Sequence, residues 1–135
     1  MRLTILTALA AILLAPATAF AGQYQEGHCS VTTPNDWVTS KTRSARPDKK
    51  VWAGLIEAPT TAEIVALETS MKATKVSEDG RIILMVSSAS FGGQTNRQYH
   101  AITKTAPSCL ADVTAPAGPE EALARQVAMT VTMKK

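Results

Sequence analysis

The sequence predicts an α+β domain in which an antiparallel β-sheet carries helices packed on its faces. Two helical patterns, near residues 60–73 and 120–135, enclose a series of strand-like segments. Between them, residues 82–86 form an unbroken apolar run, and a strand that is apolar on both sides is expected to be central and covered on each face. Strands and helices do not alternate strictly along the chain, which favours α+β over α/β. We therefore expect an α/β/α sandwich.

The start of the chain has the layout of a secretory signal peptide. A short positive start, Met1-Arg2, precedes an apolar run from Leu3 to Leu14 and a small-residue cleavage pattern that ends at Ala21. The apolar run is shorter than the roughly 20 residues that span a bilayer. We predict a cleaved signal peptide over residues 1–21, with no transmembrane segment after cleavage. The expected location is the periplasm or the medium around a bacterium.

The remaining chain, residues 22–135, is long enough for one domain and too short for two. The formal net charge of +3 falls by one when Arg2 leaves with the signal peptide. So slight a charge argues against nucleic acid as a partner. The oligomeric state is left open.

Cys29 and Cys109 are the only two cysteines of the chain. An exported protein meets an oxidising compartment, so we predict a disulfide between them. In the chain-entropy model, closing a loop of about 80 residues contributes roughly 4–5 kcal/mol. A lipid anchor is not expected, because Gly27-His28 before Cys29 is no lipobox. A redox enzyme would more often carry a C-x-x-C motif, which the sequence lacks.

Strand patterns begin early in the chain. Residues 22–27 are interpreted as a polar lead-in, residues 28–33 as a first strand that ends at Pro34, and residues 51–58 as a further strand. A first helix follows, because Thr60 and Glu63 have the spacing of a capping box. Its expected buried face holds Ile64, Leu67 and Met71, which are spaced at i, i+3 and i+7. Its expected solvent face is charged and holds Glu63, Glu68 and Lys72.

A β-hairpin is predicted at Asp79-Gly80, the preferred pair for a type I′ turn. Its strands are residues 74–78 and 81–90, and further strands are expected at 97–105 and 109–114. The final helix is marked by acidic residues in its first turn. Its apolar face repeats at i, i+4 and i+8, on Leu123, Val127 and Val131.

The turn Pro34-Asn35-Asp36-Trp37 after the first strand resembles the "P-x-G-W" turn of the Mog1/PsbP-like superfamily. The order of elements over residues 25–133, with an amphipathic helix at the end, is similar to the small secreted bacterial members of that group. The resemblance implies an α/β/α sandwich. It also implies a binding, adaptor or assembly role without catalytic residues to transfer, although a fold by itself does not establish a function.

Catalytic and metal sites are not predicted, and no cofactor is expected. The two histidines, His28 and His100, do not have ligand spacing within one element. A small serine hydrolase is kept as an alternative, since His100 on one strand can approach a serine on the preceding strand. The candidate nucleophile is Ser88 or a neighbouring serine, Ser87 or Ser90, and Asp112 is the candidate third member. This hypothesis requires a pocket that holds serine and histidine within hydrogen-bonding reach.

The most distinctive charged feature is a basic segment flanked by two tryptophans. Its members, the candidate partner-binding residues, are Trp37, Lys41, Arg43, Arg46, Lys49, Lys50 and Trp52. One interpretation is an electrostatic contact surface with aromatic anchors. The other is a solvated loop beside two buried core residues.

The function expected from these observations is that of a non-enzymatic binding or accessory protein. It would contact an envelope or exported protein whose identity the sequence does not give, and one form of this role is an inhibitor or immunity-type protein. The alternatives are the small hydrolase and a small-ligand carrier, which would need an apolar cavity of several hundred Å3 between sheet and helix.

Overall fold

The computed structural model describes residues 19–135, so nearly all of the predicted signal peptide lies outside the described residues. The strands are β1 (Gly22–Glu26), β2 (Cys29–Thr33), β3 (Val38–Thr39), β4 (Ser44–Ala45), β5 (Trp52–Ala58), β6 (Thr74–Glu78), β7 (Ile82–Phe91), β8 (Gln94–Thr103), β9 (Ser108–Pro116) and β10 (Thr132–Met133). The helices are α2 (Thr61–Ser70) and α3 (Glu121–Ala128). The predicted α+β class is confirmed.

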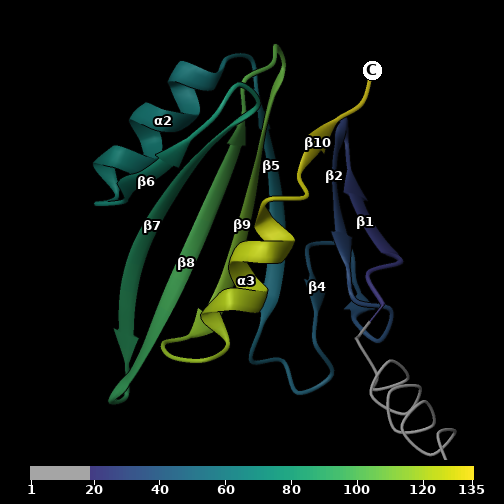
Figure 1. Cartoon of the computed structure of the whole chain (residues 1–135), viewed down its shortest axis with the longest axis vertical. Coiled ribbons are helices and arrows are strands. Elements are labelled where there is room, and N and C mark those ends of the chain that lie inside the picture. Colours follow the sequence, from purple (N-terminus) through teal and green to yellow (C-terminus); the bar gives the residue numbers. More distant parts are fainter. Residues whose placement is uncertain (1–18) are drawn as a thin grey trace, which may run out of the picture.

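The strands form two antiparallel sheets (Figure 1). The small sheet has the order β1-β2-β10, and the main sheet has the order β3-β4-β5-β9-β8-β7-β6. Residues 22–27, expected to be a polar lead-in, instead contain β1, which pairs with β2 from Gly22↔Thr33 to Glu26↔Cys29. The reason is Tyr24, whose ring is 2% exposed and belongs to the core.

The centre of the main sheet is β9, not the apolar run of residues 82–86. That run lies on β7, which is second from the edge because β6 pairs beyond it. β7 is nevertheless buried on both sides, by Leu84 on one face and Met85 on the other. The apolar run therefore predicted correctly that both faces of its strand are covered. It does not indicate how many strands of the sheet lie beyond that strand.

Strand register divides the core between the two faces of the main sheet. On the inner face, Leu84, Ala101 and Ala111 form one cross-strand row and pack with α3 and the small sheet. On the outer face, Ile102 and Leu110 form the neighbouring row. They pack with Met85 and with Ile64 of α2. The molecule thus has α2 on one side of the main sheet and α3 with the small sheet on the other.

Helix α2 begins as predicted, with Thr60 and Glu63 forming a reciprocal capping box. The predicted buried face is wrong in part, because Leu67 and Met71 are 48% and 63% exposed. Instead, the helix buries Ile64 together with Glu68. Residues four apart lie on the same helix face, and Glu68 is tolerated inside because it meets a histidine of the sheet.

The hairpin at Asp79-Gly80 joins β6 and β7 as predicted, but its turn is not type I′. That turn needs a positive φ at both central residues, and neither residue is among those of positive φ in the described chain. The Asp79 carboxylate accepts hydrogen bonds from the N–H groups of Arg81 and Ile82, each at 2.7 Å. An aspartate side chain that bonds the backbone just ahead of it closes such a turn without left-handed residues.

Helix α3 is shorter than predicted. It ends at Ala128, so Val131 lies beyond the helix and leads into β10, which pairs with β2. Val127 is buried on the face that packs against the main sheet. The periodic spacing of apolar residues does not reveal where the helix ends, because Val131 is fully buried outside the helix just as Val127 is within it.

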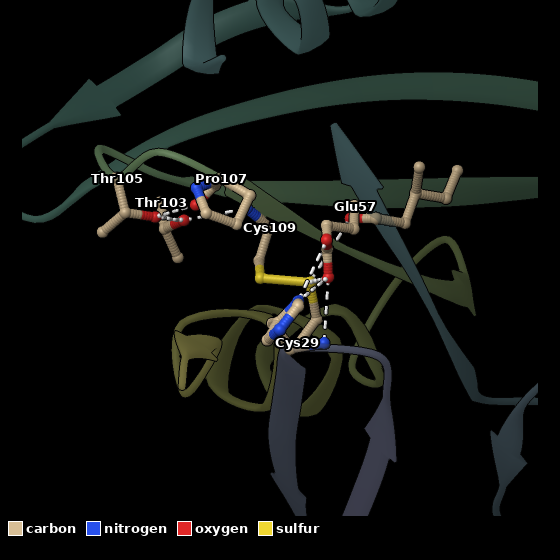
Figure 2. A network of polar contacts seen from close by, with 8 residues as sticks. Cys29, Glu57, Thr103, Thr105, Pro107 and Cys109 are labelled. Carbon is tan, nitrogen blue, oxygen red and sulfur yellow. Dashed lines mark hydrogen bonds and ion pairs between the residues drawn. A yellow bond between two sulfur atoms is a disulfide. The ribbon is translucent and has the colours of Figure 1, made fainter. Parts of the chain in front are cut away.

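The predicted disulfide joins Cys29 of β2 to Cys109 of β9 and so links the two sheets (Figure 2). Both cysteines are fully buried. The Glu57 carboxylate lies beside the bond and accepts a hydrogen bond from the His28 N–H at 2.9 Å. Full burial identifies this as a structural bond rather than a reactive one, and such bonds are typical of an oxidising compartment.

Candidate binding face on the open half of the main sheet

The outer face of the main sheet is only half covered. Figure 1 shows α2 across one end of the long strands, which continue toward the other end of the molecule. Past the row that holds His100 and Asp112, the next row consists of Trp52, Thr114, Gln98 and Ser87. Apart from Thr114, these side chains are partly exposed. We call the part of the outer face from this row to Phe91 the open half.

A buried polar cluster lies at the border between the covered and the open half. His100 is 3% exposed, and its Nδ1 lies 2.9 Å from Glu68 Oε2 and 3.6 Å from Asp112 Oδ1. Burial alone would lower the pKa of His100, but the two carboxylates outweigh it and raise that pKa above its ordinary value. Burial raises the pKa of Asp112, against the attraction of His100. The cluster therefore favours an imidazolium ion that ties α2 to the sheet.

Of the serines considered for a hydrolase, the structure brings Ser87 to His100. Ser87 Oγ lies 2.8 Å from His100 Nε2, whereas Ser88 lies on the inner face and accepts a hydrogen bond from Arg97. Ser87 donates its own proton to Gln98 Oε1 at 3.1 Å. It lies within strand β7 rather than on the sharp turn of a nucleophile elbow. The geometry resembles a Ser-His-acid set, but an imidazolium His100 donates through Nε2 and cannot accept the serine proton.

Glu68 is the functional-looking residue that sequence reasoning missed. Its place four residues after Ile64 was a usable signal, because both then share one face of α2. A charged residue on that face was assigned to solvent, since buried glutamates are rare unless paired. The partner, His100, is 32 positions away in a strand whose facing side could not be fixed in advance.

The basic residues separate into one neutralised arginine and a group of free cations. Arg46 donates to both oxygens of Asp48, at 3.0 and 2.7 Å, and also ion-pairs with Glu120. Among residues 19–135, the other four cations of the segment have no ion-pair partner. They are Lys41, Arg43, Lys49 and Lys50.

The two tryptophans have different environments. Trp37 is 8% exposed and packs in the core, so it does not contribute to a contact surface. Trp52 is partly exposed on the outer face, between Ala45 and Thr114 in the strand register. The Arg43 guanidinium lies 4.9 Å from the centre of its ring, a distance typical of a cation–π contact.

A hollow of about 350 Å3 opens on the outer face at the free edge of the main sheet. Its lining includes Val38, Arg43, Ala45, Pro47 and Lys49. Val38 is 64% exposed. We call this the edge hollow.

A larger groove of about 840 Å3 runs along α2, beside Val65, Ala66 and Ile83. It lies at the surface, on the flank of the helix, and it is lined by residues of α2 and of the β8–β9 connection. A carrier would need a cavity between the helix and the sheet, and that space is filled by Ile64, Ile102 and Leu110.

Two further findings concern the described part of the chain. Residues 19–135 contain no helix that is both long and apolar enough to cross a membrane. Over the same residues, no group of three or more His, Cys, Asp or Glu side chains has an arrangement that could hold a metal ion.

The molecule is thus a small two-sheet α+β protein with a disulfide between its sheets and an open, partly basic sheet face. A crystal structure of a protein from Bacteroides thetaiotaomicron is similar over 87% of this chain and 50% of its own, with 15% identity and a TM-score of 0.59. This chain therefore spans half the length of that protein. At such identity the likeness concerns the fold alone.

The solution structure of the cyanobacterial PsbP protein (CyanoP) from Synechocystis sp. PCC 6803 also matches. It covers 88% of this chain and 96% of its own, with 10% identity and a TM-score of 0.39. No family model and no curated protein sequence matches the chain.

Proposed function

We propose that this protein is a non-enzymatic binding or accessory protein that contacts an acidic surface of another exported or envelope protein. The observation that carries the proposal is the edge hollow, where the exposed apolar side chain of Val38 shares the lining with Arg43 and Lys49, two cations that have no carboxylate partner among the described residues. Val38, Ala45 and Pro47 form its apolar part and Arg43 and Lys49 line it, while Lys41 follows Val38 by three residues in the sequence. An apolar centre with a charged rim is the usual anatomy of a protein interface.

The loop that carries these cations is held in place before any partner arrives. Arg46 is fixed by Asp48 and Glu120, and the Lys50 N–H donates to Asp48 at 2.9 Å. The Lys49 N–H donates to the Arg46 carbonyl at 2.7 Å. A preorganised loop loses less conformational entropy on binding than a mobile one. The neutralised arginine therefore serves as a support, and the free lysines remain available to a partner.

The compartment fits this role. A buried disulfide between the sheets is typical of proteins that work in an oxidising environment. One form of the function is an inhibitor or immunity-type protein that neutralises an exported enzyme. Such a protein needs a rigid, charged contact surface rather than a catalytic pocket.

The test is co-purification of a partner with the full chain, exported from a bacterium through its predicted signal peptide and carrying a C-terminal tag. The triple variant Lys41→Gln, Arg43→Gln, Lys49→Gln removes the free cations around the edge hollow. The matched control Lys72→Gln, Arg125→Gln, Lys134→Gln removes the same charge elsewhere. We expect a stoichiometric partner that is lost at high salt and in the first triple variant, and kept in the control.

A partner lost equally from both triple variants would point to net charge rather than to this surface, against the proposal. Absence of any stoichiometric partner with the unmodified protein would also count against it.

A serine hydrolase is the second candidate, favoured by the 2.8 Å contact between Ser87 Oγ and His100 Nε2. It is tested by labelling the purified chain with a fluorophosphonate probe, which reacts with activated serines. Labelling of the unmodified chain that disappears in Ser87→Ala and persists in Ser88→Ala would establish the hydrolase. No labelling is expected, because the Ser87 proton is directed to Gln98.

A further inference from the structure

A second hollow, of about 350 Å3, lies on the open half of the sheet. It is enclosed by β5, β8 and β9 on one side and by the β4–β5 loop on the other, and we call it the sheet hollow. The side chains that matter are Lys50, Trp52, Gln94, Asn96, Thr114 and Glu120. It shares only Lys49 with the edge hollow.

Thr114 supplies the strongest sign that this hollow receives a ligand. The residue is 6% exposed, and its hydroxyl has no hydrogen-bond partner among the described residues. It lines the hollow, between Trp52 and Gln98 in the strand register. Buried polar atoms in native proteins are nearly always paired, so an unpaired hydroxyl on a residue that lines a hollow indicates that a polar partner is missing there.

The other walls supply three kinds of chemistry. Within residues 19–135, the side-chain amides of Gln94 and Asn96 make no hydrogen bond, so both can donate and accept. Trp52 gives a flat apolar wall. Lys50 is a cation without a carboxylate partner, whereas Glu120 is ion-paired with Arg46. A ligand that satisfies all of these groups has several hydroxyls, one apolar face and a negative charge.

We propose that the sheet hollow binds a small acidic saccharide, a carboxylated mono- or disaccharide. Its carboxylate would meet Lys50, its hydroxyls would meet Thr114, Asn96 and Gln94, and the C–H face of its ring would lie against Trp52. Indole rings present a negative face that attracts such weakly positive C–H groups. The hollow is at the small end of the ~300–1,000 Å3 range of ligand pockets, which suits one or two sugar rings rather than a long polymer. This function goes beyond the proposed protein contact and uses different residues.

The experiment is calorimetric titration of the full chain, exported through its predicted signal peptide, with a panel of small probes. Glucuronate, galacturonate and N-acetylmuramate are the acidic sugars, glucose is the neutral sugar, and acetate is the simple anion. We expect at least one acidic sugar to bind saturably with a Kd of about 1 mM or lower. Glucose and acetate should each bind at least about tenfold more weakly, since each lacks one set of contacts.

Two substitutions locate the site. Thr114→Val keeps the shape and removes the hydroxyl, and Lys50→Gln removes the charge; each should weaken the acidic sugar about tenfold. The controls are Thr95→Val, whose side chain faces the inner side of the sheet beside Ser90, and Lys72→Gln, an exposed residue in the turn after α2. Amide NMR spectra of each variant report that the fold is retained.

Three results would overturn the proposal. They are no binding of any acidic sugar in the tens of millimolar range, acetate binding as tightly as the acidic sugars, or full affinity in both Thr114→Val and Lys50→Gln. The Lys41, Arg43 and Lys49 substitutions that test the protein contact leave Lys50 and Thr114 intact. Failure of one proposal is therefore distinguishable from failure of the other.

Discussion

The covered and open halves of the outer face are built from the same strands, yet their composition differs sharply. Under α2, strands β8 and β9 present Ile102 and Leu110, which are fully buried. Four residues away on the same face, the same two strands present Gln98 and Thr114. A ten-residue helix is about 15 Å long, while a ten-residue strand spans about 33 Å. One short helix therefore covers about half of the face, and side-chain polarity changes where its cover ends.

A strand can therefore change its environment midway without any break in backbone pairing. The ladder between β8 and β9 continues from Asn96↔Pro116 to Ile102↔Leu110 without interruption. Stability resides in the covered half and on the inner face, while Thr114, whose buried hydroxyl has no partner among the described residues, lies in the open half. The substitutions below test this division.

The largest effect is expected from removing the disulfide that joins the two sheets. The double variant Cys29→Ala, Cys109→Ala opens a loop of 80 residues and should lower the free energy of unfolding by about 4–5 kcal/mol. Urea unfolding followed by circular dichroism measures the change. The unmodified protein unfolded under reducing conditions is the control and should lose a similar amount. A loss below about 1 kcal/mol in both would mean that the sheets are held together by packing alone.

A matched pair of truncations compares the two halves directly. Leu110→Ala in the covered half leaves a cavity under α2 and should cost about 3 kcal/mol. Gln98→Ala in the open half removes a partly exposed side chain and should cost less than about 1 kcal/mol. Urea unfolding of both variants checks the contrast. Equal losses would show that the open half contributes to stability as the covered half does.

At the border, His100 should make stability depend on pH. Its pKa is raised in the folded state, because the pull of Glu68 and Asp112 exceeds the effect of burial. The group therefore stabilises the fold fully below its ordinary pKa of 6.5, and this stabilisation is lost as the pH rises through the folded value. The raised pKa of Asp112 acts in the same direction at lower pH.

The measurement for His100 is the free energy of unfolding at several pH values between 6 and 9. We expect it to fall with rising pH in the unmodified protein and in His28→Gln, and to change less in His100→Gln. His28 is the matched control because its side chain is more than half exposed and lies next to Glu57. An unchanged pH slope in His100→Gln would assign the dependence to another group.

The smallest effect is expected within the open half. Thr114→Val removes a buried hydroxyl that has no partner among the described residues and replaces it with a methyl group of similar size. Because an unpaired buried polar group is unfavourable, stability should stay the same or rise by about 1 kcal/mol. Urea unfolding is again the measurement. A clear loss of stability would show that the hydroxyl has a structural partner after all.

Local signals predicted the parts of the fold that local chemistry determines. The capping box at Thr60, the hairpin at Asp79 and the disulfide between Cys29 and Cys109 all lie where expected. These features depend on residues close in sequence, or on there being only two cysteines to pair. The α+β class followed from the order of such segments.

Features that depend on contacts distant in sequence were not predictable in the same way. The rotation of α2 depends on Glu68 meeting His100, and the placement of β1 depends on Tyr24 reaching the core. In the same way, Trp37 and Trp52 occupy similar positions beside the basic segment, yet only the three-dimensional register buries the first and exposes the second. For the candidate site, the sequence supplied the basic residues and Trp52, while Thr114 entered only through strand pairing.

The link between β2 and β9 also constrains how the protein is made. Because Cys29 lies near the start of β2 and Cys109 near the start of β9, the bond cannot close until nearly every strand of the main sheet has been synthesised. Only α3 and β10 follow β9 in the chain. With two cysteines in the whole chain, there is one possible intramolecular pairing. Maturation therefore needs a thiol oxidase but no disulfide isomerase. Before the bond forms, the main side reaction is a disulfide between the free Cys29 thiols of two incomplete chains.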